Sequence, residues 1–284
     1  MSQKIIKKDT VLVNASYTLS LAEQRLILLA IADAGGKPDL LKDMTVVAAD
    51  YANRFGVTRQ AAYNALREAS TQLFERKFSY ERISAKGRPR QVMSRWVQRI
   101  EYGEAEGLVK LKFADDVIPL LTDLQKRFTS YALEQVAGLT SVHAVRIYEL
   151  LIAWRSSKKT PVFELGEFRK QLGISDDEYP RMDNFKRRVL DASIKQINEH
   201  TDITAKYEQH KKGRSISGFS FTFKMKKSAQ VLELPAKPKR KQITKREAEQ
   251  MARPGELWPQ LLDRLKGEYW ITDLESKPDT SDEG

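Results

Sequence analysis

The chain of 284 residues contains no cysteine. This absence excludes disulfides, thiolate zinc sites and a cysteine nucleophile together. No run of apolar residues approaches the length of a membrane span, and residues 1–10 lack the apolar core of a signal peptide. We therefore expect a soluble, cytoplasmic protein with no membrane partner.

Motifs of catalysis are missing as well. The three histidines, His143, His200 and His210, are not spaced as a metal-binding pair, and no two of them flank one apolar residue as in a rolling-circle nickase. The nucleotide-binding pattern Gly-x-x-x-x-Gly-Lys-Ser/Thr is also absent, since the single Gly-Gly-Lys runs into Pro38. The sequence predicts a binding protein that is not an enzyme and that uses no catalytic residue, metal or cofactor.

Positive charge is in excess, with 49 Lys and Arg against 38 Asp and Glu and a net charge of +11. Lys and Arg that neutralise phosphates release condensed counterions, so this excess favours a polyanionic partner. Charge alone also fits a scaffolding protein with a basic surface. The length and the 41% apolar content suffice for two modest cores, which predicts two domains.

A repeated segment is the most informative feature that is present. Residues 80–88, Tyr-Glu-Arg-Ile-Ser-Ala-Lys-Gly-Arg, return at 207–214 as Tyr-Glu-Gln-His-Lys-Lys-Gly-Arg. Each copy follows two helix-like stretches, and each is a strand-like run with a basic turn and a second strand after it. This order is typical of a winged helix. We predict an α+β fold with two tandem winged-helix (helix-turn-helix) domains at residues 1–139 and 140–227.

Local signals place several elements of the first domain. Ser20 and Glu23 form a capping box that predicts a helix over 21–34. Thr58 caps a second helix with one apolar and one polar face. Residues 92–100 are expected to be one strand, and 109–113 another.

Leu12, Leu19 and Leu26 lie seven residues apart, which suggests either a zipper or a buried helix. Asp33 breaks the series, so core packing is favoured over a coiled coil. The same three leucines are nevertheless our candidates for a homodimer interface.

The helix expected over 182–199 carries the strongest binding signal. If Phe185, Val189, Ala192 and Ile197 face inward, a basic face turns outward. Arginine pairs bidentately with guanine and asparagine with adenine, so this face suits the reading of base edges, although a solvated basic face is the alternative. The candidate DNA contacts here are Arg181, Asn184, Lys186, Arg187, Arg188 and Lys195.

The two basic turns are the predicted wings. A glycine between cations makes a tight hairpin that projects charge toward phosphates, although lysine at a sheet edge also deters strand pairing. The candidates in the wings are Lys211, Lys212 and Arg214, and Lys86, Arg88 and Arg90; those in the first-domain helix are Arg59, Gln60, Asn64 and Arg67.

The chain changes character after Lys227. Residues 235–246 combine six Lys and Arg with two prolines, which predicts a flexible basic linker and tail over 228–284. Within it, residues 256–274 suit a short amphipathic helix.

Several blocks together resemble the Rep_3 family of bacterial plasmid replication initiators. They are 14–20 (Asn-Ala-Ser-Tyr-Thr-Leu-Ser), 144–151 (Ala-Val-Arg-Ile-Tyr-Glu-Leu-Leu), 163–169 and 184–190 (Asn-Phe-Lys-Arg-Arg-Val-Leu), followed by the turn at 211–214. The resemblance covers residues 10–226 and is specific because the blocks recur in the right order. It implies two winged helices that bind direct repeats, called iterons, in double-stranded DNA of a plasmid origin.

The resemblance further implies a monomer that binds iterons and a homodimer, in equilibrium with it, that represses its own gene. It also implies host partners, an initiator and the replicative helicase. By position, the recognition helix of the second domain would use Arg181, Arg187 and Arg188. A transcriptional regulator with two winged helices and no initiator role is the alternative, because its DNA contacts would be identical.

Overall fold

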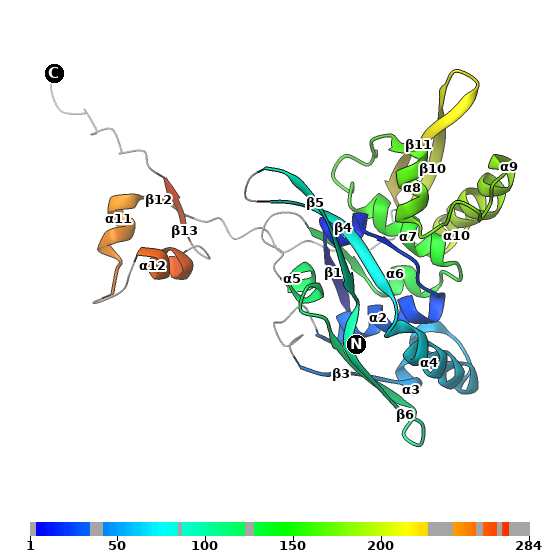
Figure 1. Ribbon diagram of the computed structural model, residues 1–284, viewed down its shortest axis with the longest axis horizontal. Coiled ribbons are helices and arrows are strands. Elements are labelled where there is room, and N and C mark those ends of the chain that lie inside the picture. The colour runs from blue at the N-terminus through cyan, green and yellow to red at the C-terminus, as the bar shows by residue number, and fades with distance from the viewer. Residues whose placement is uncertain are drawn as a thin grey trace. The chain divides into compact units, whose positions relative to one another are not determined.

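A computed structural model of the chain describes residues 4–34, 42–84, 87–122, 128–226, 241–253, 258–265 and 269–272. The chain divides into two compact units, Met1–Gln230 and Val231–Gly284. The larger unit contains both winged helices (Figure 1).

The first winged helix follows from local capping signals. The capping box forms as predicted, with Ser20 N donating to Glu23 Oε2 at 2.5 Å and Glu23 N to Ser20 Oγ at 3.2 Å. Thr58 Oγ1 accepts from Ala61 N at 3.2 Å and begins the second helix. The elements are β1 (Ile5–Asp9), α1 (Thr10–Asn14), β2 (Ser16–Tyr17), α2 (Leu21–Ala34), β3 (Met44–Val47), α3 (Ala48–Phe55), α4 (Arg59–Leu73), β4 (Lys77–Ile83), β5 (Pro89–Arg95), β6 (Val97–Gly103), β7 (Leu108–Phe113), α5 (Val117–Thr122), β8 (Phe128–Ala132) and α6 (Glu134–Ala137).

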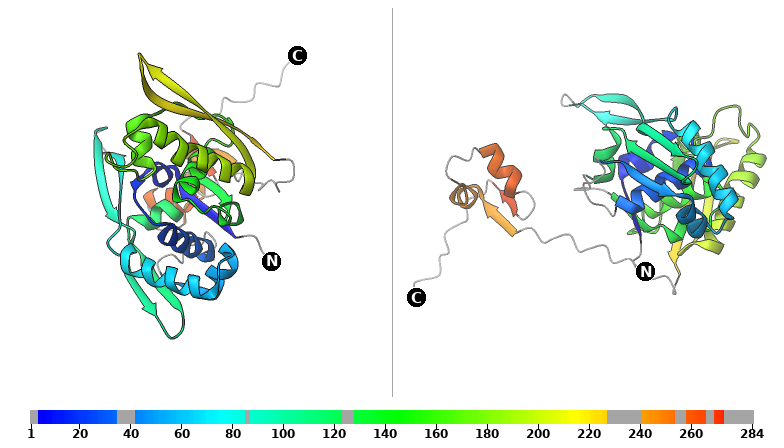
Figure 2. Two further views of the ribbon diagram at one scale, coloured as in Figure 1. Left: turned by 90° about the vertical axis from the view of Figure 1, so that its right-hand side faces the viewer. Right: turned by 90° about the horizontal axis from the view of Figure 1, so that it is seen from below.

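The prediction of one strand over 92–100 is wrong, because Trp96 interrupts it and separates β5 from β6. β5 pairs with β4 in a sheet of order β2-β4-β5, whereas β6 pairs with β7 in a sheet of order β3-β7-β6. The Trp96 indole is fully buried and meets the ring of Tyr17 edge-on at 4.9 Å. Burial of this large ring draws the backbone inward, and the two hairpins extend in different directions (Figure 2).

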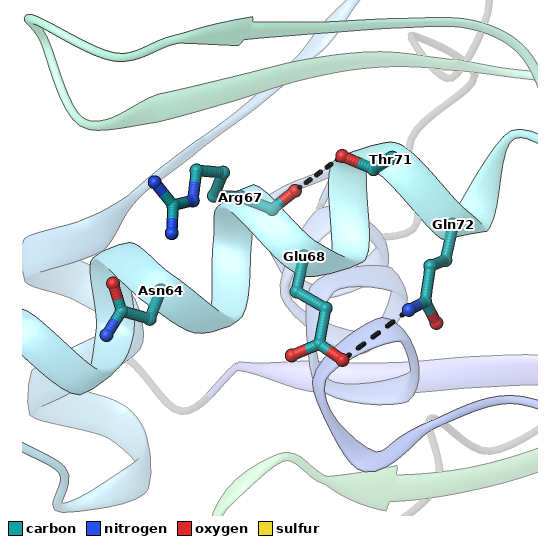
Figure 3. Close-up of a pocket in the computed structure, with 5 residues that line it drawn as sticks. All are labelled: Asn64, Arg67, Glu68, Thr71 and Gln72. Atoms are coloured by element: carbon teal, nitrogen blue, oxygen red, sulfur yellow. Dashed lines mark hydrogen bonds between the residues drawn. The ribbon is translucent and has the colours of Figure 1, made fainter.

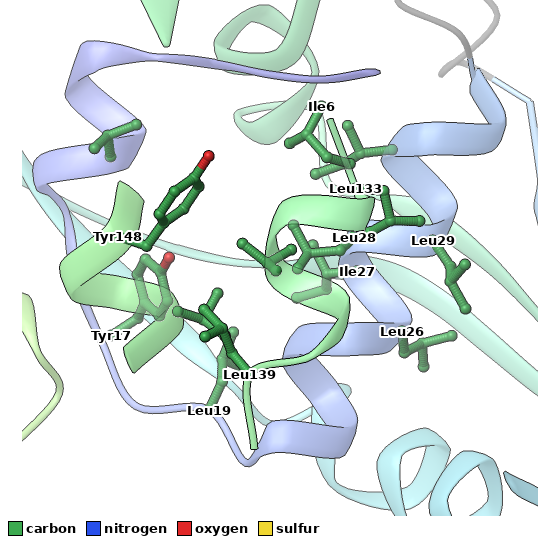
Figure 4. Packing of buried hydrophobic residues seen from close by; sticks show 14 of the residues in the cluster. Ile6, Tyr17, Leu19, Leu26, Ile27, Leu28, Leu29, Leu133, Leu139 and Tyr148 are labelled. Carbon is green, nitrogen blue, oxygen red and sulfur yellow. The ribbon is translucent and has the colours of Figure 1, made fainter. Parts of the chain in front are cut away.

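The core packing favoured for the three leucines is confirmed, whereas their candidacy for a homodimer interface is not supported in this conformation. Leu12 lies in α1, Leu19 in the loop before α2, and Leu26 in α2, so the three do not share a helix. All three are buried in the core of the single chain, and Figure 4 shows Leu19 and Leu26 among its packed side chains. They form no zipper, and in this conformation they offer no surface to a second chain.

The second winged helix has an aromatic core. The rings of Phe168, Phe185, Phe219 and Phe221 pack together with centroids 5.7–6.5 Å apart. Its elements are β9 (Phe163–Glu164), α8 (Leu165–Gln171), α9 (Met182–Phe185), the π-helix η2 (Lys186–Asp191), α10 (Ala192–His200), β10 (Ile203–Lys212) and β11 (Ser215–Met225), with strand order β10-β11-β9.

A π-helical turn interrupts the helix predicted over 182–199. In an α-helix, Phe185 and Ile197 would lie about 120° apart around the axis, since each residue turns the chain by about 100°. The π turn takes up roughly one extra residue, so both side chains reach the core. Ala192, predicted to face inward, is only half-buried, and Ser193 takes the buried position.

Helix α7 (Val142–Ile152) lies between the two winged helices and begins with Ser141 Oγ accepting from Ala144 N at 3.4 Å. It carries Arg146 and Glu149, which are 1% and 0% exposed. Lys8 of β1, 1% exposed, donates to Glu149 Oε1 at 2.6 Å, and Arg146 Nη1 donates to Glu149 Oε2 at 2.9 Å. One buried carboxylate thus joins β1 to α7.

The smaller unit has more structure than the single short helix predicted for the tail. β12 (Lys241–Thr244) pairs in parallel with β13 (Tyr269–Thr272), and α11 (Lys245–Gln250) and α12 (Trp258–Leu265) join them. Ala248, Leu261 and Leu265 form its buried core. α12 falls within the helix predicted over 256–274, whereas most of the basic linker lies outside the described residues.

Among the helices of the described ranges, none is long and apolar enough to cross a membrane.

We predict that Glu149→Gln lowers the free energy of unfolding at pH 7 by about 3–5 kcal/mol, because Lys8 and Arg146 lose their buried counter-charge. Burial alone would raise the pKa of Glu149, but the charges of Lys8 and Arg146 outweigh it and lower the pKa below 4.5. A carboxylate with a depressed pKa stabilises the fold above its unfolded pKa and ceases to do so as the pH falls through the folded value. Urea titrations should therefore show the difference from wild type shrinking below about pH 4.5.

The control is Glu167→Gln, which removes an exposed pair with Lys170. This variant should change the free energy of unfolding by less than about 0.5 kcal/mol. Equal effects of the two substitutions would contradict the role given to Glu149.

Candidate nucleic-acid interface

The turn between α8 and α9 is held by one arginine. Arg169 Nη2 donates to the carbonyl oxygens of Ser175, at 2.7 Å, and Glu178, and Nη1 donates to that of Tyr179 at 3.4 Å. Its guanidinium also lies over the Phe185 ring, 5.4 Å from the centroid. The angle between α8 and the following helix is therefore set by contacts inside the second winged helix.

The residues predicted to face outward from α9, η2 and α10 are accessible to solvent. Arg181, Arg187, Arg188 and Lys195 are exposed, and Asn184 and Lys186 are half-buried. These helices supply the cations and the amide that the sequence proposed for DNA, and that contact stays a prediction.

Hydrogen bonds arrange part of this face. Arg187 Nη2 donates to Asn184 Oδ1 at 2.9 Å, which couples the two side chains suited to base edges. Arg181 forms a two-point pair with Asp183, at 3.1 and 2.8 Å. This hydrogen-bonded pair lowers the pKa of Asp183. Arg181 is therefore partly neutralised, which weakens its predicted contribution relative to Arg187.

Two contacts anchor the recognition helix to strand β10. Lys186 Nζ donates to Gln209 Oε1 at 3.0 Å, and Tyr207 Oη donates to Asp191 Oδ1 at 2.7 Å. Asp191 is exposed and is held by this contact with the strand. Helix and wing are held as one body.

The second wing is the hairpin of β10 and β11. Lys211, Lys212 and Arg214 are all exposed at its tip. Gly213 adopts φ +65°, a left-handed conformation that favours glycine, and allows the tight turn. Figure 1 shows this hairpin projecting from the larger unit near α9.

In the first winged helix, α4 exposes all four predicted contacts, Arg59, Gln60, Asn64 and Arg67. Gln60 Nε2 donates to Asn64 Oδ1 at 3.3 Å. An open depression runs along this face and is lined by Asn64, Arg67, Glu68, Thr71 and Gln72 (Figure 3). Glu68 places an acidic group there, so this helix is less suited to phosphates than its counterpart.

The first wing contains an arginine that sequence reasoning missed. In the β4–β5 hairpin, Arg82 lies directly opposite Arg90, and both are exposed, as is Arg88. Like charges opposite one another destabilise a strand pair, and an anion between them relieves the repulsion. Counting residues symmetrically back from the turn would have found Arg82. Lys86 lies outside the described residues.

Over the described ranges, no group of three or more His, Asp or Glu residues is arranged to hold a metal ion.

Comparison with known proteins follows the division seen in the fold. A family model described as Initiator Replication protein, WH1, matches residues 5–152, and one described as Initiator Rep protein, WH2, matches residues 164–223. The first match includes α7, whereas we predicted a boundary at 139 and 140.

Two relatives and one solved structure are similar to this chain over most of its length. A "Replication initiation protein" of Escherichia coli is 26% identical over 229 residues, covering 78% of this chain and 70% of that protein. The "PI protein" of Escherichia coli is 26% identical over 236 residues, covering 72% and 77%. A crystal structure of a Pi initiator protein in complex with iteron DNA, 23% identical, matches with a TM-score of 0.67 over 80% of this chain and 99% of that chain.

The solved structure supports the fold, and the family models decide between the initiator and the transcriptional regulator considered above. The first model alone spans over half of the 284 residues, and the second follows it in the same order. This chain belongs to the initiator Rep proteins, a family of DNA-binding replication initiators with two winged helices and not a family of enzymes.

Proposed function

We propose that the chain initiates plasmid replication by binding direct repeats in duplex DNA at the origin as a monomer. The observation that carries the proposal is the pairing, in each winged helix, of an exposed polar helix with a basic hairpin. The names of the relatives, and the iteron DNA bound by the similar Pi initiator, support it. The chain opens or bends the origin without hydrolysing a nucleotide.

The recognition helix of the second winged helix reads bases in this proposal. Arg187 and Asn184, joined at 2.9 Å, present a guanine-pairing and an adenine-pairing group side by side. The mutual bond limits the rotamers of both side chains before DNA binds, so less conformational entropy is lost in the complex. Arg188 and Lys195 lie on the exposed side and suit phosphates.

The wings contact the phosphate backbone. Lys211, Lys212 and Arg214 concentrate three charges at one tip, and Arg82 and Arg90 place two more across the first hairpin. Such contacts set orientation and affinity but carry little sequence information.

We predict that Arg187→Ala costs about 1–3 kcal/mol on the preferred duplex and relaxes specificity at one base pair. Lys212→Ala should weaken all sequences alike and reduce the salt dependence of binding by about one unit of slope. The measurements are gel shifts over a salt series, with a duplex selected from a random pool and with mismatched versions of it.

The matched control is Lys224→Ala, an exposed lysine on the same hairpin about 30 Å from the tip along β11. It should bind as wild type does. Unchanged binding of all three variants at every salt concentration would mean that DNA lies on another face of the molecule.

The proposal has three further parts. They are a homodimer in equilibrium with the monomer, repression of the chain's own gene, and contacts with a host initiator and helicase. They are supported by the family resemblance.

Since the three leucines are buried, we place the dimer contact on β5, an edge strand. Ile83 and Met93, 60% and 67% exposed, lie on the same face of this hairpin, opposite the face of Arg82 and Arg90. An open edge with apolar side chains suits pairing with a second copy.

Met93→Lys should therefore weaken the dimer by at least tenfold while leaving the monomer folded, because a charge replaces exposed apolar surface at the contact. Sedimentation equilibrium measures the dimer dissociation constant, and the control is Met251→Lys, at a methionine of the smaller unit that is 40% exposed. A dimer unaffected by Met93→Lys would place the contact elsewhere.

A further inference from the structure

The Arg146 guanidinium is buried where the two winged helices meet. From α7 its Nη2 donates to the carbonyl oxygens of Val13 and Ala15, both at 3.0 Å, in the first winged helix. Its Nε and Nη2 also donate to the carbonyl oxygen of Gln171, the last residue of α8, at 3.0 and 2.9 Å. One planar group therefore binds the backbones of both winged helices.

The environment of Arg146 leaves it little freedom. Its Nη1 donates to Tyr17 Oη at 2.6 Å and to Glu149, and its guanidinium stacks 4.1 Å from the centre of the Tyr17 ring. The fork of an arginine matches several acceptors at once, whereas a lysine is a point charge on a flexible stem. The contact is thus directional as well as electrostatic.

Two hydrogen bonds nearer the surface repeat this connection. Ser16 Oγ donates to the carbonyl oxygen of Lys170 at 3.0 Å, and Thr18 Oγ1 donates to that of Gly173 at 3.1 Å. At Gly173 a Cβ atom would lie 2.3 Å from the Tyr17 carbonyl oxygen, so the two backbones approach closely. We call the set of contacts made by Ser16, Thr18 and Arg146 the junction.

Both recognition helices are tied to the junction. Arg76, just after α4, pairs with the buried Glu23 at 2.8 Å, and Glu23 also binds Ser20 N beside the Thr18 loop. On the other side, Gln196 of α10 accepts from Thr140 N and Ser141 N, at 2.9 and 3.2 Å, where α7 begins. A change in the distance between α4 and α10 would therefore break contacts at the junction.

We propose that Arg146 is a positioning residue that fixes the spacing at which two DNA half-sites are read. Helix-turn-helix units read half-sites about 10–10.5 base pairs apart for each helical turn, and each inserted base pair rotates one half-site by about 35° around the axis. A protein with a rigid junction tolerates one spacing. The proposal rests on the proposed function, because it requires both winged helices to contact DNA.

The test uses the full chain and duplexes with spacers altered by one to five base pairs. For wild type we expect a five-base-pair insertion, about half a turn, to weaken binding by about 100-fold. Arg146→Lys and the double variant Ser16→Ala with Thr18→Ala should reduce this penalty to about tenfold, since each lost hydrogen bond is worth a factor of about 2–10. Affinity for a single half-site should not change.

Arg155→Lys is the control, because Arg155 pairs with Asp202 at 3.6 Å outside the junction. It should keep the wild-type spacing penalty. If Arg146→Lys does not fold, the double variant decides, since it removes only two contacts near the surface.

Junction variants that bind with the wild-type penalty would overturn the proposal and leave the proposed function intact. Wild-type protein that ignores one half-site altogether would overturn both, because then only one winged helix contacts DNA.

Discussion

The burial of Glu149 between Lys8 and Arg146 is the interaction on which the larger unit depends. Three charged groups at most 1% exposed are costly to desolvate, and only close pairing offsets that cost. One carboxylate cannot neutralise two cations, and the charge of Arg146 is stabilised further by hydrogen bonds to backbone carbonyl oxygens and to the Tyr17 hydroxyl. Such a cluster adds little net stability over an apolar core, but its directional bonds allow one arrangement of β1, α7 and α8 and penalise others.

This arrangement separates two tasks. Buried side chains of α7 and the loops around it set the geometry of the molecule, while exposed side chains of α4, η2 and the hairpins meet the solvent. Even on the exposed face, internal bonds such as that from Arg187 to Asn184 restrict the side chains. The surface proposed to bind DNA is therefore partly ordered by its own hydrogen bonds.

Local signals were readable from the sequence, and contacts between distant residues were not. The Ser20 and Thr58 caps and the inward positions of Phe185, Val189 and Ile197 depend on neighbours within a few turns, and the structure confirms them. Three features depend on partners far along the chain or on strand register. They are the interruption between β5 and β6 at Trp96, the pairing of Arg82 with Arg90, and the contacts of Arg146. Core packing of Leu12, Leu19 and Leu26 was favoured from the sequence and is confirmed, whereas their choice as dimer candidates rested on equal spacing, which says nothing about exposure.

The π turn of Lys186–Asp191 also restricts how this family member can evolve. Converting this turn to ordinary α geometry without removing a residue would rotate everything before it by about 100° relative to Ile197. Phe185 would then leave the aromatic cluster that it forms with Phe168 and Phe219. The π turn is therefore a constraint on substitution: residues that favour α geometry there would remove a core side chain, whereas loss of one residue with return to an α-helix would keep Phe185 and Ile197 on one face.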